Sequence, residues 1–127
     1  MNLWSYDSIK DKVIWNMEIA EQTMVDAVDH LVDLAPPAKT AVIVNLGDYY
    51  HVDDNSKKTK RSGNLVDVDG RQEQAYQVGI RILRRCVDRA LEKHENVHVI
   101  CEIGNHDDLS AYMLALCIDN YYHTPRS

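Results

Sequence analysis

Two short apolar runs, each ending in a glycine-led polar motif, constrain the fold of this chain more than any other feature. The run "AVIVNL" at 41–46 leads into Gly47 and Asp48, and "VHVICEI" at 97–103 leads into "GNHD" at 104–107. Runs of this length, rich in β-branched residues and bounded by turn signals, predict β-strands, the first of them buried on both faces. The glycines let the backbone turn sharply where each strand ends.

Helical periodicity surrounds these two runs. Apolar residues spaced by three and four predict a helix from Val13 to Leu34, which Pro36 and Pro37 end. A longer apolar stripe predicts a second helix over 71–94, and Asp107 or Asp108 is placed to cap a third. The basic residues of the second helix lie mostly off its stripe and are interpreted as a solvated face: Arg81, Arg84, Arg85 and Arg89.

Alternation of helix and strand predicts an α/β domain with a parallel sheet and crossover helices. At 127 residues the chain fits one domain, residues 1–127. In such sheets functional residues gather just beyond the carboxyl ends of the strands. Both polar motifs follow strands directly, so we expect them to meet at one edge of the sheet.

The net charge and the cysteines limit which classes of protein this chain can belong to. The net charge of -6, from 14 basic and 20 acidic residues, disfavours a nonspecific nucleic-acid coat. Cys86, Cys101 and Cys117 lack CxxC spacing and lie in apolar surroundings, which favours buried free thiols in a reducing compartment. No apolar run approaches the roughly 20 residues that span a bilayer. The sequence therefore predicts a cytoplasmic protein that does not enter membranes.

The polar motifs carry donors suited to a cation. The stretch "VNLGDYYHVDDN" at 44–55 crowds carboxylates, which repel one another unless a cation or proton is shared between them. Asp48 offers a carboxylate that can bridge two cations, Asn105 a neutral carbonyl oxygen, and His106 a ligand nitrogen or a proton donor. Such oxygen-rich ligation suits magnesium, manganese or iron better than structural zinc.

These residues also carry a family resemblance. "LGD" followed by "GNHD" after a helical crossover resembles the second and third motifs of the calcineurin-like metallophosphoesterases, and the loop from "GDYYHVDDN" to "VDVDGR" is similar to phage-encoded members. The resemblance spans about residues 41–110. It implies a partial metallophosphoesterase-like sandwich and a hydrolase with two divalent metal ions, manganese first, with magnesium, iron, zinc and nickel as alternatives.

Carried over by position, the resemblance assigns roles to individual residues. Asp48 would bridge two metals and Asn105 would bind one of them, while His106 would lie over the substrate phosphate, so that His106 and Asp48 are the catalytic pair. The substrate would be a phosphomonoester or phosphodiester, with nucleic acid or a nucleotide as candidates. His51 and Asp53 do not map onto the family's core ligands. Together with Asp107, they are candidates for the substrate loop or for support of the ligands.

The chain departs from the family outside these motifs. The family opens with a D-x-H motif before "GD" and closes with two later histidine motifs, and none of these is present. We therefore interpret the chain as an internal piece of a longer phosphoesterase, with a naturally minimal version as the alternative. In either case we expect weak metal binding and little activity from this chain alone.

Other classes of protein remain open. A non-catalytic interaction module, self-associating where strands are missing, would explain the absent ligands. A nucleotide-binding α/β protein is the third hypothesis, although no GxGxxG or GxxxxGK loop is present. Among the remaining histidines, we expect His30 and His94 on helix surfaces and His98 on a strand, facing solvent or a neighbour.

Overall fold

The computed structural model describes residues 5–7, 12–50, 69–105 and 107–123. This part of the chain is an α/β structure with three helices, an antiparallel strand pair, and a parallel pair in which Thr40 lies opposite Asn96 and Asn45 opposite Cys101. The elements follow in the order β1 (Ser5–Asp7), β2 (Lys12–Trp15), α1 (Met17–Leu34), β3 (Thr40–Asn45), α2 (Asp69–Leu91), β4 (Asn96–Cys101) and α3 (Asp108–His123).

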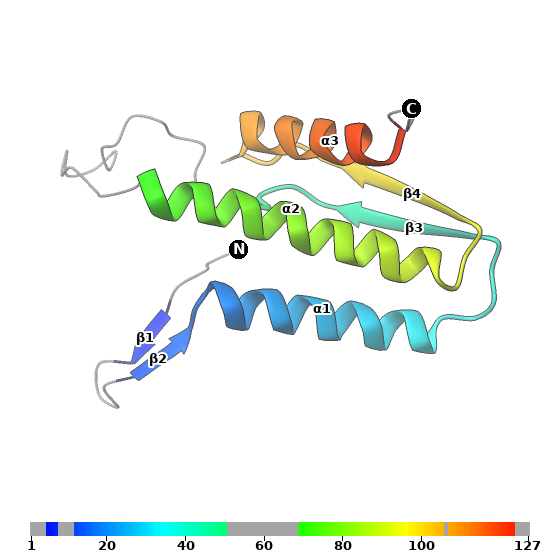
Figure 1. The fold of residues 1–127 in the computed structure, drawn as a ribbon, viewed down its shortest axis with the longest axis horizontal. Coiled ribbons are helices and arrows are strands. Elements are labelled where there is room, and N and C mark those ends of the chain that lie inside the picture. The colour runs from blue at the N-terminus through cyan, green and yellow to red at the C-terminus, as the bar shows by residue number, and fades with distance from the viewer. Residues whose placement is uncertain (1–4, 8–11, 51–68, 106, 124–127) are drawn as a thin grey trace.

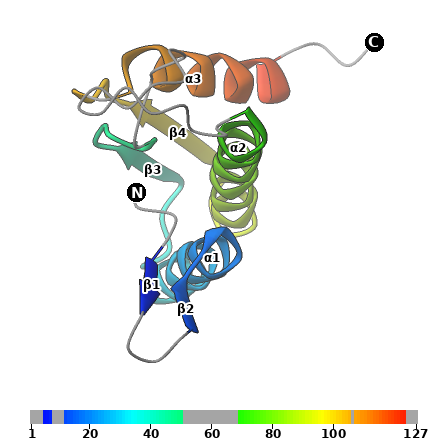
Figure 2. The same ribbon diagram turned by 90° about the vertical axis from the view of Figure 1, so that its left-hand side faces the viewer.

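The three helices run in one direction, and the parallel strands β3 and β4 run in the opposite one (Figure 1). The carboxyl ends of both strands and the beginnings of α2 and α3 therefore lie at the same end of the molecule. Viewed along the elements, α2 covers one face of the sheet, α3 lies beside β4, and α1 packs on α2 away from the sheet (Figure 2).

Helix α1 begins at a local capping signal. The Asn16 side chain accepts a hydrogen bond from the backbone amide of Ile19 at 2.8 Å, which satisfies one of the free donors of the first turn. The helix ends at Leu34, just before Pro36. The prediction of a helix from Val13 was wrong, because residues 12–15 form β2 and pair with β1 instead.

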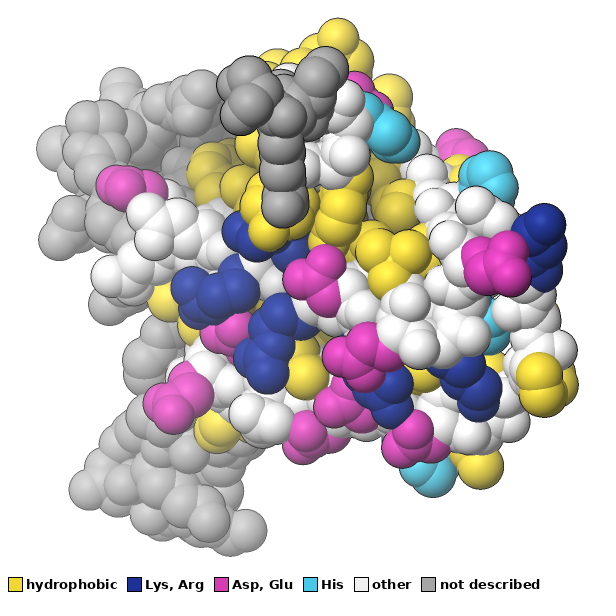
Figure 3. All heavy atoms as spheres, turned by 45° about the vertical axis from the view of Figure 1, so that its right-hand side comes forward, with side chains coloured by type: hydrophobic (Ala, Val, Ile, Leu, Met, Phe, Trp, Pro, Cys, Tyr) yellow, Lys and Arg dark blue, Asp and Glu magenta, His cyan; other side chains and the backbone are white. Residues whose placement is uncertain are grey.

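Ion pairs at a nearly constant sequence offset join α1 to α2. Glu21 receives two hydrogen bonds from Arg81, both at 2.6 Å, and Asp29 receives one from Arg89 at 3.1 Å. These partners are 60 residues apart, as expected for two parallel helices in register. Basic and acidic side chains lie side by side on this surface (Figure 3). The helix face predicted to be merely solvated therefore also forms part of the α1–α2 interface.

The core lies between the three helices and the inner face of the sheet, with Met17 and Val28 of α1 packed against its α2 residues. One cluster contains Tyr50, Leu83, Leu114 and Ile118, and a second contains Val78, Ile82 and Cys86, with Ile43 of β3 packed against both. The α2 members confirm most of the apolar stripe predicted for that helix. All three cysteines are free thiols, as expected, but Cys86 alone among them is fully buried.

His94 is a correction to the predicted helix surface. It is buried just beyond the end of α2, and its Nδ1 lies 2.8 Å from the carbonyl oxygen of Ala38. The chain leaves the helix before His94 and turns toward β4, which carries the ring inward under the α1–β3 connection. His30 and His98 are exposed, as predicted.

The outer face of the parallel sheet is bare. Val42 is 57% exposed and Ile100 is 44% exposed, whereas their neighbours in each strand alternate toward the helices. The prediction that β3 is buried on both faces was therefore wrong: helices cover one face, and the other contacts solvent. Within the described ranges, none of the helices combines the length and apolar character needed to cross a membrane.

Candidate functional site at the carboxyl ends of β3 and β4

The loops that follow β3 and β4 abut each other. Gly47 and Asp48 both adopt left-handed backbone conformations, with φ of 90° and 51°. Gly104 allows the contact, because a Cβ atom there would fall on the amide nitrogen and Oδ1 of Asp48. A Cβ on Gly47 would in turn lie 2.9 Å from the Cα of Gly104. The glycine of each motif thus makes room for the other loop.

A single carboxylate fixes both loops. Asp107 is 0% exposed, and its Oδ1 accepts hydrogen bonds from the amides of Gly104 at 3.0 Å and Asp48 at 3.2 Å. Its Oδ2 accepts one from the amide of Tyr50 at 3.2 Å, and its carbonyl accepts the amide of Ala111, which opens α3. Asp107 therefore ties together the ends of two strands and the start of a helix.

Two tyrosines anchor the β3 loop to the middle of α2. The Tyr49 hydroxyl donates to the carbonyl of Gly79 at 2.9 Å, and the Tyr50 hydroxyl donates to that of Tyr76 at 3.2 Å. Gly79 is required there, because a Cβ would lie 2.6 Å from the Tyr50 ring. Burial raises the pKa of both Tyr49 and Tyr50. These hydroxyls therefore stay protonated and serve as structural donors.

The two predicted metal ligands that the structure describes both follow the ends of the parallel strands. Asp48 and Asn105 are both exposed at the carboxyl end of the sheet, and Asp48 Oδ1 lies against Gly104, the residue before Asn105. Asp107 lies beneath them and contacts backbone amides of both loops. His51, Asp53 and His106 lie outside the described residues.

The donors present fit part of a metal site. A carboxylate and an amide oxygen are ligands that magnesium and manganese accept. Within the described ranges, however, no three His, Cys, Asp or Glu side chains come close enough to hold a metal ion. Asp48 and Asn105 are therefore too few to form a dinuclear centre from the described residues alone.

Sequence reasoning missed the main role of Asp107. The sequence predicted a residue of the substrate loop, a support for the ligands or a helix cap at this position. The sequence pattern does not show that this acid binds the amides of a loop 57–59 residues earlier. The sequence did contain one signal that the β3 loop is held in place, namely Gly79. A glycine inside a strongly helical pattern often marks a close approach, here by Tyr50.

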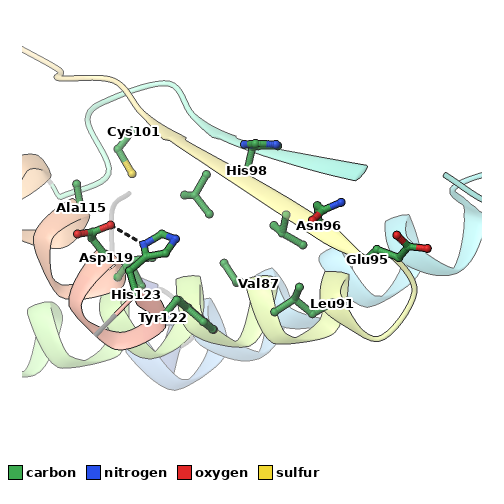
Figure 4. Close-up of a pocket in the computed structure, with 13 residues that line it drawn as sticks. Val87, Leu91, Glu95, Asn96, His98, Cys101, Ala115, Asp119, Tyr122 and His123 are labelled. Atoms are coloured by element: carbon green, nitrogen blue, oxygen red, sulfur yellow. Dashed lines mark hydrogen bonds and ion pairs between the residues drawn. The ribbon is translucent and has the colours of Figure 1, made fainter. Parts of the chain in front are cut away.

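The structure also contains a groove that lies away from the strand-end loops. A groove of about 630 Å³ runs between α2, β4 and α3, with Val87, Leu91 and Val97 among its apolar walls (Figure 4). On its rim, His123 Nδ1 lies 2.6 Å from Asp119 Oδ1. The groove extends to Asn96, toward the amino ends of the strands. Neither Asp48 nor Asn105 lines it, so it is separate from the strand-end loops.

Comparison with known proteins adds no relative: no family model, no curated protein and no solved structure matches this chain.

Proposed function

We propose that this chain supplies the strand-end loops of a metal-dependent phosphoesterase, with Asp48 and Asn105 as oxygen ligands to a divalent cation. The observation that carries the proposal is the joint anchoring of the two loops by Asp107. That carboxylate contacts backbone amides of both loops, and this supports the proposal because Asp48 and Asn105 are exposed residues of those loops.

Each described residue has a distinct part in this proposal. Asp48 presents a carboxylate and Asn105 a neutral carbonyl oxygen, a combination that favours manganese or magnesium. When bound, two such cations would polarise the phosphoryl group and lower the pKa of a water nucleophile. Asp107 is a positioning residue, because both of its side-chain oxygens already accept hydrogen bonds from backbone amides.

The remainder of the proposal extends beyond the described residues. By resemblance, His106 would act on the leaving oxygen, but His106 lies outside the described residues. The bare outer face of β3 and β4 supports a partial metallophosphoesterase-like sandwich, since parallel sheets are normally covered on both faces. We accordingly propose that this chain alone is weakly active.

The test is manganese-dependent hydrolysis of an aryl phosphodiester by the native chain and its Asp48→Asn variant. Asparagine tolerates the left-handed backbone at this position, so the substitution removes charge with little strain. We expect the rate to fall at least about 100-fold, because a carboxylate that would hold the cation is lost. Asp26→Asn, the same change at an exposed position of α1, should leave the rate unchanged. Equal rates in the native chain and Asp48→Asn would refute the assignment.

A non-catalytic interaction module is the second candidate, favoured by the exposed apolar surface. Leu46 is 84% exposed at the end of β3, next to the bare face that carries Val42 and Val44. Light scattering across a hundredfold range of concentration separates the two functions. Self-association that Val44→Lys abolishes, together with an absence of manganese-dependent hydrolysis, would favour the interaction module.

A further inference from the structure

A small, half-open cavity adjoins the proposed site. It has a volume of about 270 Å³ and lies between α2, α3 and Tyr50 of the loop that follows β3. Its walls are almost entirely apolar and include Tyr50, Tyr76, Ile80, Met113, Leu114 and Cys117. At that volume it lies near the lower end of ligand cavities, which run from roughly 300 Å³ upward, so it has room for one ring system and not for a whole nucleotide.

The residue that forms one wall of the cavity is held by the same carboxylate as the strand-end loops. Tyr50 forms one wall, and its amide is held by Asp107, whose other oxygen holds the amide of Asp48. Asp48 and Tyr50 are two residues apart, so their Cα atoms lie within about 7.6 Å. Ser110, another wall residue, is in the first turn of α3, just after Asp107. A group bound in the cavity would thus lie beside the loop that presents Asp48.

The walls suit an aromatic ring. The rings of Tyr50 and Tyr76 meet edge to face with centroids 4.9 Å apart, an arrangement that a further ring can extend. Met113 and Cys117 add polarisable sulfur, which contacts aromatic rings favourably. Ser110 and Tyr76 also line the cavity, and the Ser110 hydroxyl donates to the Tyr76 hydroxyl oxygen at 3.0 Å.

We propose that this cavity binds the aromatic group of the substrate, so that the ester hydrolysed is an aryl or nucleobase-bearing phosphate. The assignment of the ring to a substrate rests on the proposed phosphoesterase function. The binding of a ring does not, because it requires no metal. Ring binding and hydrolysis can therefore be measured separately.

Ring binding is tested with the matched pair phenol and cyclohexanol in EDTA. With methionine methyl groups labelled for NMR, phenol should shift the Met113 signal, while Met17 and Met24 on α1 serve as internal references. We expect phenol to bind at least tenfold more tightly than cyclohexanol. Equal affinity for the two alcohols, or equal shifts at Met113, Met17 and Met24, would overturn the proposal.

Variants locate the ring. Cys117→Leu should fill the cavity and abolish the phenol signal, whereas Leu116→Ala, on the same helix but outside the cavity, should not. Circular dichroism checks that both variants fold. If Cys117→Leu does not fold, Met113→Ala takes its place, with saturation transfer to phenol as the measurement. Met113 is half exposed and tolerates truncation, so undiminished transfer in that variant would exclude the cavity.

Hydrolysis completes the test and separates the two proposals. With manganese, methyl phenyl phosphate should show a KM at least tenfold below that of methyl cyclohexyl phosphate, and Cys117→Leu should remove the difference. If phenol does not bind in EDTA, the proposal that the cavity binds an aromatic ring is overturned, even if both esters are hydrolysed. Ring binding without hydrolysis of either ester would instead overturn the phosphoesterase function and, with it, the assignment of the ring to an ester.

Discussion

The carboxylate of Asp107 accepts a hydrogen bond from the backbone amide of Asp48, a residue 59 positions earlier in the chain. The same oxygen also accepts the amide of Gly104, so the ends of two parallel strands converge on one atom. A buried carboxylate that binds several amides in this way replaces the water that each group loses on folding. The geometry of the proposed site therefore depends on a residue that need not touch a ligand.

Asp107→Asn should destabilise the fold. An amide retains one acceptor and directs an N–H group toward backbone donors, so at least one of the three bonds is lost and a buried donor is left unsatisfied. We expect a loss of about 2–4 kcal/mol in the free energy of unfolding, measured by urea denaturation. Asp108→Asn, one residue further on and exposed, is the control and should change stability by less than about 0.5 kcal/mol.

Gly104→Ala should be more damaging than an ordinary glycine replacement. The added methyl group would fall on the backbone amide and the carboxylate of Asp48, and it would lie 2.7 Å from Asp107 Oδ1. Because these atoms belong to packed loops, the loops must separate, and we expect a loss of at least about 2 kcal/mol. Thermal unfolding measures it. An unchanged midpoint would show that the two loops do not abut as described.

Position 48 should respond to backbone strain independently of charge. Asp48 has a φ of 51°, a conformation that glycine adopts without penalty and alanine does not. Both substitutions remove the same side-chain interactions, so Asp48→Ala should be less stable than Asp48→Gly by roughly 1 kcal/mol. Both variants should lose metal-dependent activity equally. A stability order with alanine above glycine would contradict the left-handed conformation.

The Glu21–Arg81 pair should make stability depend on pH. The hydrogen bond from Arg81 lowers the pKa of Glu21, more than desolvation raises it. A carboxyl whose pKa is lower in the folded state stabilises the fold above its unfolded pKa, and this contribution disappears as the pH falls through the folded pKa. The difference in urea midpoint between native and Glu21→Gln protein should therefore be largest near neutrality and vanish in acid.

A double-mutant cycle with Arg81→Gln tests whether Arg81 causes the lowered pKa of Glu21. If Arg81 is responsible, Glu21→Gln should have almost no effect, and no pH dependence, in the Arg81→Gln background. Because Arg81 is half exposed, 1 M salt should also weaken the contribution. A pH-dependent difference that persists without Arg81 would point to Arg85, which lies 3.8 Å from the same carboxylate.

The sequence predicted the order of the main elements because their patterns are local. The apolar stripe of α2 and the two β-branched runs each indicate their own conformation, and the order of helix and strand then favours a parallel pair. The beginning of α1 was misplaced because Val13 fits a helical spacing as well as a strand. What decides between them is the pairing of residues 12–15 with β1, a contact that periodicity does not contain.

The candidate site was only partly predictable for a similar reason. That Asp48 and Asn105 lie at one end of the sheet follows from the parallel order of the strands. The inward position of Asp107 does not follow from the strand order. An aspartate before a helix ordinarily caps that helix, whereas Asp107 binds amides of the preceding loops. The ion pairs of Arg81 and Arg89 likewise join residues about 60 positions apart, beyond any local pattern.

Asp107 recognises main-chain N–H groups, which every residue except proline possesses. The side chain displayed at position 48 can therefore be exchanged without removing the hydrogen bond that places it, provided that the replacement accepts a left-handed backbone. Position 105 likewise follows an anchored amide and is itself exposed. The residues that fix the loop geometry are thus separate from the side chains exposed at positions 48 and 105. Other metal-binding side chains could replace Asp48 and Asn105 while the loops keep the same conformation.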